Sequence, residues 1–168
     1  MDAISERFRP LLIRLARITN DAVFLMARSG DYVVCLSRVE GDHTTRAYVV
    51  EVGVRRLLGA SAAGVAIMAQ LPESEVNLLL HRHEAEYARQ HHSLAALKAA
   101  VLRTRTLGYS EIHNTLIDSD GVGCAFQLAE SYWAGISIAV AKHRSSPERL
   151  NELAQLLMNE IRQVQESV

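Results

Sequence analysis

Six small residues in a row, from Gly59 to Gly64, constrain this chain more than any other stretch of its sequence. Side chains this small add almost no bulk, so the backbone itself contacts whatever lies beside it. Ser61 is a good helix N-cap, and the apolar residues after it predict a short helix that ends near Leu71 and Pro72.

The first amides of that helix, on Ala62, Ala63 and Gly64, have no partner within the helix itself. They can donate hydrogen bonds to an anion, which the positive end of the helix dipole also favours. Tight packing of the helix on a sheet selects alanine and glycine as well. These residues therefore leave two readings open, a ligand site and a packing site.

The composition is typical of a globular protein and gives no indication of binding to a membrane or to nucleic acid. The 168 residues fit one domain, 49% of them are apolar, 22% are charged, and the net charge is −1. A net charge this close to zero leaves no excess of positive charge to attract nucleic acid or an anionic membrane. No apolar run reaches membrane-spanning length and no signal peptide opens the chain, so we expect a cytoplasmic protein.

Two cysteines, Cys35 and Cys124, lie far apart and form no CxxC pair. Two free thiols in a reducing compartment are the simpler interpretation, with a disulfide as the alternative.

Apolar periodicity divides the chain into strands and helices. Strands are expected over residues 21–27 and 32–39, joined by a turn at 29–31, and over 44–52, where Gly53 ends the meander. Three more are expected over 109–117, 123–129 and 134–141, with Tyr132 and Trp133 in the turn before the last. The sequence thus predicts an α+β domain, an antiparallel sheet of about six strands flanked by helices.

Helices are expected over residues 8–18, from 61, from Pro72, from Ser93 to Gly108, and from Pro147 to the end. The last has a clear apolar face: Leu150, Leu153, Leu157, Met158, Ile161 and Val164. Its other positions are expected in solvent: Arg149, Glu152, Asn159 and Glu160.

A set of short motifs, each weak alone, follows a specific order and spacing over nearly the whole chain. It consists of Val52-Gly53, the loop Gly59–Gly64, Leu71-Pro72-Glu73, Leu107-Gly108-Tyr109, Gly121–Ala125 and Ile136–Ala139. In this the chain resembles the effector-binding domain of the isocitrate-lyase-regulator (IclR) family of bacterial transcription regulators.

The resemblance implies a GAF-like fold, no enzymatic activity, no cofactor and no metal, and a pocket for a small organic acid. It implies a homodimer or homotetramer whose DNA contacts are made by an N-terminal winged helix-turn-helix domain. That domain is absent here, so the chain is expected to be an isolated sensor domain, 1–168, whose residues 1–20 form the linker or first helix, with Met1 added.

The resemblance also implies which residues bind the ligand. The family's amide loop corresponds to Ala62, Ala63 and Gly64 beside Ser61, and its later pocket positions correspond to Cys124 and Ser137. Ala139 is the next inward position on the strand of Ser137. Asn114 and Asp118 are alternatives for the usual pocket acid, and the apolar walls are expected from Val65, Met68, Leu116 and Phe126.

The chain departs from the family at several of these places. Leu57-Leu58-Gly59 stands where relatives have Pro-x-His, and Val65 stands where they have lysine. Tyr132-Trp133 replaces a glycine-containing turn. The departures at Leu57-Leu58-Gly59 and at Val65 support a rival hypothesis, in which the domain is an oligomerisation or interaction module with a degenerate pocket.

Other chemistry has a weaker basis. The histidines of segment 81–92 lack an HExxH motif or a closed ligand set, so a polar surface explains them better than a metal site. Cys124 is read as a pocket thiol or a small core residue, and as a nucleophile only in the enzyme alternative, because no base accompanies it. Trp133 suits a subunit interface, a pocket lid or simple packing.

Overall fold

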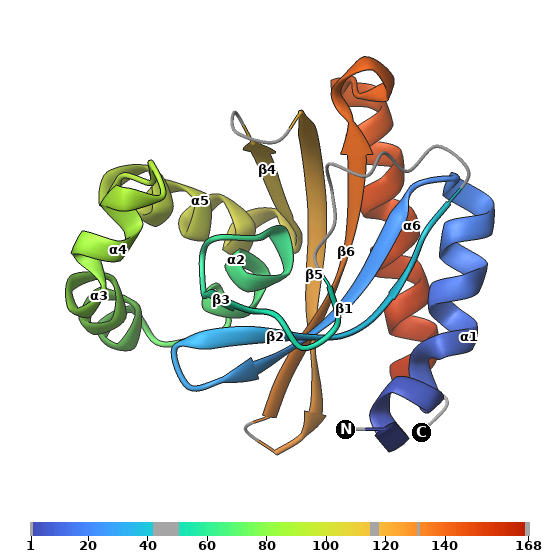
Figure 1. Cartoon of the computed structure of the whole chain (residues 1–168), viewed down its shortest axis with the longest axis horizontal. Helices are drawn as coiled ribbons and strands as arrows, with labels where there is room; N and C mark the ends of the chain where they lie inside the picture. Colours follow the sequence, from blue (N-terminus) through green and yellow to red (C-terminus); the bar gives the residue numbers. More distant parts are fainter. Residues whose placement is uncertain (1, 42–50, 115–117, 131, 167–168) are drawn as a thin grey trace.

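The fold is a six-stranded antiparallel sheet with helices on both faces (Figure 1). We describe it from a computed structural model over residues 2–41, 51–114, 118–130 and 132–166. The strands, in spatial order β3-β2-β1-β6-β5-β4, are β1 (Ala22–Ser29), β2 (Tyr32–Val39), β3 (Arg55–Leu57), β4 (Ser110–Asn114), β5 (Ser119–Ala129) and β6 (Tyr132–Ala141). This confirms the predicted α+β class and the number of strands.

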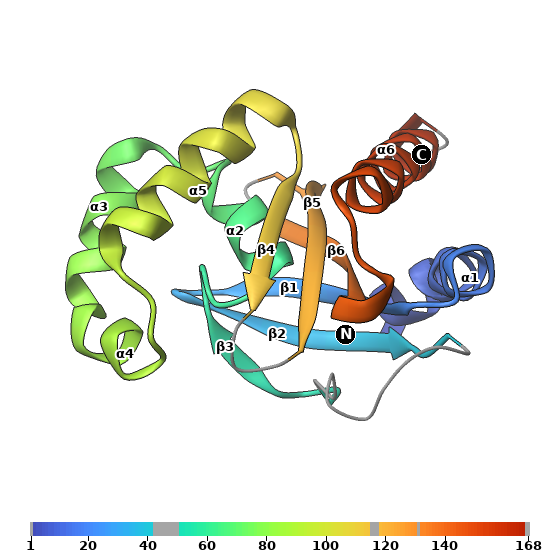
Figure 2. The ribbon, with the colours of Figure 1, turned by 90° about the horizontal axis from the view of Figure 1, so that it is seen from above.

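Two layers of helices cover the sheet, α1 and α6 on one face and α2 to α5 on the other (Figures 1 and 2). Their bounds are α1 (Asp2–Thr19), α2 (Ala62–Met68), α3 (Glu73–Arg82), α4 (Glu84–Arg89), α5 (Leu94–Leu107) and α6 (Pro147–Glu166). The helix expected from Pro72 is therefore two helices, which divide at His83. In the part of the chain that the structure describes, no helix is both long and apolar enough to cross a membrane.

The first hairpin forms as predicted because its turn has the right chemistry. Gly30 adopts φ +63°, a left-handed conformation that glycine tolerates without strain. The turn joins Ser29 to Tyr32, which pair across the hairpin. This places β1 beside both β2 and β6 in the middle of the sheet.

The strand β3 follows the expected strand 44–52 in the chain and does not overlap it. Residues 42–50 of the expected strand 44–52 lie outside the described residues, and positions 51 and 52 form no strand. Gly53 does not end the meander: its φ of +90° leads into β3, which pairs with β2 so that Arg56 lies opposite Val33.

The hairpin of β5 and β6 is longer than predicted, and the prediction of a turn at Tyr132 and Trp133 is wrong. Both residues are already in β6, where Trp133 pairs with Gln127 and Tyr132 with Ala129. The apolar ring surfaces of two aromatic residues suit a strand, which explains the difference.

The layer of α1 and α6 covers one core. Leu150, Leu153, Leu157 and Ile161 are buried as predicted, together with Leu12 and Leu15 of α1. Glu160 was expected in solvent and is only 4% exposed, because its carboxylate pairs with Arg14 at 2.8 Å. Arg149 likewise turns inward, to the Thr19 carbonyl and to Asp21.

Candidate functional site

The start of α2 is capped by its own serine. The Gly64 amide donates to Ser61 Oγ at 3.1 Å, and the Val65 amide donates to the Ser61 carbonyl at 2.9 Å. Ser61 is thus the N-cap that the sequence predicted. The expectation that the Gly64 amide faces a ligand does not hold, because its hydrogen has a partner within the chain.

The same helix start lies directly on the sheet, through close contacts at two glycines. A Cβ added to Gly123 would lie 2.6 Å from the Ala62 carbonyl carbon, and one added to Gly135 would lie 3.2 Å from the Ala63 Cβ. Ser110 Oγ donates to the Ala62 carbonyl oxygen at 2.5 Å. The packing reading of these small residues therefore holds for Ala63, which is fully buried.

Beside this contact, a small hollow remains between the loop before α2 and the sheet. We call it the inner hollow; its volume is about 90 Å³. It is lined by Phe24, Met26, Arg56, Ala60, Ser61, Ala62, Ile112, Ser119, Asp120, Gly121, Ser137, Ile138 and Ala139. Of the residues that the sequence proposed as ligand contacts, the structure brings Ser61, Ala62, Ser137 and Ala139 together here.

Other proposed contacts lie behind the hollow or away from it. Ala63, Gly64 and Met68 are buried in α2, where Met68 packs in the core with Ala63. Val65 is buried but reaches a neighbouring cleft, described below.

Cys124 faces the opposite side of the sheet from the inner hollow. Successive residues of a strand point to opposite faces, and its neighbour Gly123 faces α2. Cys124 packs instead with Phe126 in the core under α1 and α6, so neither residue reaches the hollow. Burial raises the pKa of the Cys124 thiol to about 12. Both Cys124 and Cys35 are buried free thiols, as the simpler prediction had it.

The two alternatives for a pocket acid are at the β4–β5 connection. Asn114 is the last residue of β4, and its side chain lies outside the described residues, as does Leu116. Asp118 is exposed, and its carbonyl oxygen accepts a hydrogen bond from the Lys142 amide. The acid that does line the inner hollow is Asp120, two residues further along.

The carboxylate of Asp120 already has partners within the protein. Lys142 Nζ lies 2.5 Å and His113 Nδ1 2.9 Å from its Oδ1, and Ser145 Oγ donates to Oδ2. Burial alone would raise the pKa of Asp120, but the hydrogen bonds from Lys142, Ser145 and His113 outweigh it and lower the pKa. Asp120 therefore stays ionised and already neutralised by its neighbours.

Arg56 is the functional candidate that the sequence reasoning missed. It lies on β3, half buried, and lines the inner hollow. No carboxylate among the described residues pairs with it, and burial lowers the pKa of its guanidinium. The basic pair Arg55-Arg56 inside an otherwise apolar run, Val54 to Leu58, is a signal that could have found it.

A larger cleft opens next to the inner hollow, and we call it the outer cleft. Its volume is about 710 Å³, and it shares Arg56, Ala60 and Ile112 with the inner hollow. Figure 2 shows the elements that surround it, β3 and β4 on one side and α4 and α5 on the other.

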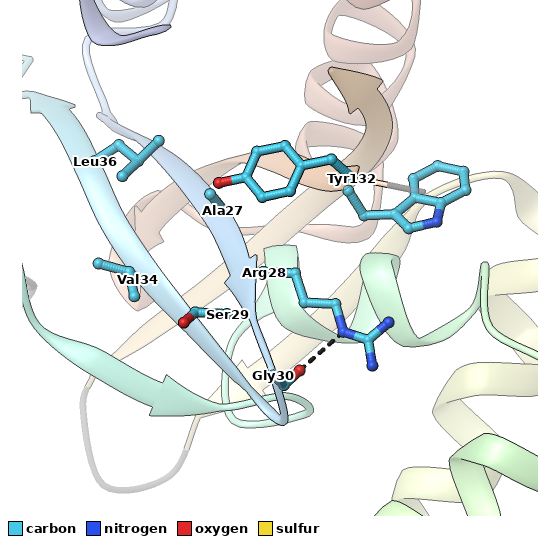
Figure 3. Close-up of a pocket in the computed structure, with 8 residues that line it drawn as sticks. Ala27, Arg28, Ser29, Gly30, Val34, Leu36 and Tyr132 are labelled. Atoms are coloured by element: carbon cyan, nitrogen blue, oxygen red, sulfur yellow. Dashed lines mark hydrogen bonds between the residues drawn. The ribbon is translucent and has the colours of Figure 1, made fainter. Parts of the chain in front are cut away.

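A third hollow, of about 530 Å³, lies at the end of the first hairpin, beside Tyr132 and Trp133 (Figure 3). Its cation, Arg28, is already occupied: Nε donates to the Gly30 carbonyl at 2.8 Å, and the other end pairs with Glu75 at 2.7 Å. Of the proposed ligand contacts whose side chains the structure describes, none lines this hollow.

Two residues of the histidine segment contact the same carboxylate, that of Asp31. His83 Nε2 lies 2.7 Å from Asp31 Oδ2, to which Arg82 also donates at 2.6 Å. Among the residues described, no group of three or more histidine, cysteine, aspartate or glutamate side chains is placed to hold a metal ion.

Comparison with known proteins places this arrangement in a family. The model for the C-terminal domain of bacterial IclR transcriptional regulators matches residues 2–166. The chain is 30% identical over 169 residues to the HTH-type transcriptional regulator BhcR of Paracoccus denitrificans, covering 95% of this chain and 58% of that protein. It is 26% identical to KipR of Bacillus subtilis, covering 95% of this chain and 65% of KipR. The chain thus spans about three fifths of the length of these relatives.

Solved structures show the same fold. The IclR of Thermotoga maritima superposes with a TM-score of 0.82 at 21% identity, over 98% of this chain and 68% of that one. The C-terminal domain of the Escherichia coli regulator KdgR superposes with a TM-score of 0.79 at 23% identity, over 98% and 96% of the two chains. The chain therefore belongs to the IclR family of bacterial transcriptional regulators, as their C-terminal domain.

Proposed function

We propose that this domain binds a small organic acid in the inner hollow and that binding changes how the regulator binds DNA. Its relatives carry the name of HTH-type regulators, so the DNA contacts are assigned to a helix-turn-helix domain outside this chain. The domain acts as a cytoplasmic homodimer or homotetramer and catalyses no reaction.

One observation carries the proposal: the half-buried guanidinium of Arg56 lines the inner hollow and has no carboxylate partner among the described residues. A guanidinium presents several donors in a plane that matches a carboxylate. Leaving such a charge partly desolvated and unpaired costs free energy, which a bound acid would offset.

The rest of the hollow suits the same ligand. Ser137 lines it from β6, and Ala62, the first residue of α2, lines it from the other side. Because Asp120 is already neutralised by Lys142, its carboxylate does not repel an incoming acid. The Arg56 cation and the Ser137 hydroxyl, in a largely apolar lining, therefore suit the binding of an acid.

Binding can change DNA affinity only if the ligand prefers one arrangement of the subunits or of helix α1 over another. Helix α1, the first of this chain, packs on β1 and β2, and β1 also lines the inner hollow through Phe24 and Met26. A shift of β1 on ligand binding is the shortest mechanical route from the hollow to α1.

The test is thermal unfolding of the domain against a panel of small carboxylates and aromatic acids. A ligand at a hundred times its Kd stabilises by about 2.7 kcal/mol, which raises Tm by roughly 5–10 °C in a chain of this size. Arg56→Gln should abolish the shift. Arg28→Gln is the matched control, since Arg28 lines the third hollow and should leave the shift unchanged.

The rival function is an oligomerisation or interaction module with a degenerate pocket. The small volume of the inner hollow and the capped Gly64 amide favour it. If no acid raises Tm and light scattering finds a stable oligomer, this rival replaces the sensor. A shift that survives Arg56→Gln and is lost in Arg28→Gln would move the ligand to the third hollow.

A further inference from the structure

The inner hollow has room for the acid group and little more of a larger ligand. Its volume of about 90 Å³ compares with roughly 300–1,000 Å³ for sites that enclose drug-sized ligands. The outer cleft, at about 710 Å³, lies within that range and begins at the same Arg56. An acid longer than the inner hollow, with its carboxylate at Arg56, would therefore extend the rest of its body into the outer cleft.

The lining of the outer cleft is more apolar than polar, and among its charged side chains the arginines outnumber the carboxylates. Arg55, Arg56 and Arg103 line it, against the carboxylates of Glu86 and Glu111. Glu111 Oε1 lies 3.4 Å from His113 Nε2, and the guanidinium of Arg55 lies 4.9 Å from the centre of the Tyr32 ring. Arg55 and Glu111 thus have neighbours of their own, whereas Glu86 Oε2 is buried without a hydrogen-bond partner among the described residues.

Arg103 has no such neighbour. It projects from α5, across the cleft from β3, and no carboxylate among the described residues pairs with it. The histidine of the cleft that is most buried adds no charge at neutral pH, because burial and then His91 lower the pKa of His92. Arg103 is therefore the cation that is available to a second anionic group.

We infer that the ligand is a dianionic acid, with one carboxylate at Arg56 in the inner hollow and a second acidic group at Arg103 in the outer cleft. This rests on the proposed function, since it assumes that Arg56 holds the first carboxylate. The two arginines lie on β3 and α5, on different walls of the cleft, so they would bind the two ends of an elongated molecule rather than one group.

The experiment compares a homologous series of straight-chain dicarboxylates with the monocarboxylates of the same chain lengths, by calorimetry at constant ionic strength. At the best chain length, the dicarboxylate should bind about tenfold tighter than its monocarboxylate, the gain expected for one added charged hydrogen bond. Arg103→Gln should remove that preference and leave monocarboxylate binding unchanged. Lys98→Gln, an exposed cation on α5 outside the cleft, should leave the preference intact.

The outcomes separate this inference from the proposed function. If monocarboxylates bind, depend on Arg56 and gain nothing from a second acidic group, the inference is wrong and the proposed function stands. An equal effect of Lys98→Gln and Arg103→Gln would also overturn it, because general charge would then explain the preference. If neither series binds at any chain length, the proposed function itself fails.

Discussion

Gly123 and Ala62 touch through their backbones. A Cβ added to Gly123 would lie 2.6 Å from the Ala62 carbonyl carbon and 2.7 Å from its oxygen. These two atoms belong to the first turn of α2, so β5 and the helix that borders the inner hollow are held together where no side chain fits.

Gly123→Ala is therefore expected to destabilise the domain by pushing α2 off the sheet. Overpacking against backbone costs about 1–3 kcal/mol, or roughly a 3–10 °C loss of Tm in a chain of this length. Gly121→Ala is the control, because its Cβ would meet the Ala62 Cβ at an ordinary 3.5 Å. Thermal unfolding that moves equally in both variants would contradict this close contact.

A second prediction concerns Asp21, which is 1% exposed and pairs with two arginines. Arg144 Nε lies 3.3 Å from Oδ1, and Arg149 lies 3.1 Å from Oδ2. Asp21→Asn leaves both cations without their carboxylate, so we expect a loss of about 2 kcal/mol or more. Urea unfolding should show a lower midpoint at an unchanged slope.

The control for Asp21 is Glu40, whose exposed carboxylate pairs with Arg38. Surface pairs of this kind contribute about 0–1 kcal/mol, so Glu40→Gln should leave the midpoint nearly unchanged. A midpoint shift in Glu40→Gln as large as that in Asp21→Asn would show that burial of Asp21 is not what matters.

Local chemistry was enough to predict the elements that border the site. The Ser61 cap, the turn at Gly30 and the end of α5 at Gly108, with φ +85°, each depend on neighbours in the chain. The face on which a strand residue lies is different. Because successive residues of a strand point to opposite faces of the sheet, the sequence predicts that Gly123 and Cys124 face opposite sides. Which of the two faces α2 is known only from the close approach of that helix to Gly123.

The cation of the site could not be predicted because its position is set by contacts between distant segments. Arg56 reaches the inner hollow through the pairing of β3 with β2, where it lies opposite Val33. The prediction that Glu160 lies in solvent was wrong for the same reason. Its position on the helix favours solvent, but its partner Arg14 lies near the other end of the chain. Only the tertiary structure brings such partners together.

The carboxyl group of Asp120 leads to a prediction of how the stability of the domain depends on pH. Its pKa is lowered in the folded state, because the hydrogen bonds from Lys142, Ser145 and His113 outweigh its burial. The stabilisation is therefore present above the ordinary aspartate value of 3.8 and is lost as the pH falls through the folded value. Asp120→Asn should be less stable than wild type at neutral pH, and the gap should narrow below about pH 3.8. A gap in urea midpoints that is constant with pH would contradict it.

The two cysteines test the remaining enzyme alternative. Burial raises the pKa of Cys35 to about 11 and that of Cys124 to about 12, so neither forms a thiolate at neutral pH in the folded protein. A disulfide-exchange reagent should therefore titrate no thiol in the native domain and both thiols in urea. Cys124→Ala provides the assignment, because it should lose one of the two equivalents in urea and change nothing in the native state. Rapid native labelling that disappears in Cys124→Ala would mean that this thiol is reachable and activated, and it would reopen the case for a nucleophile.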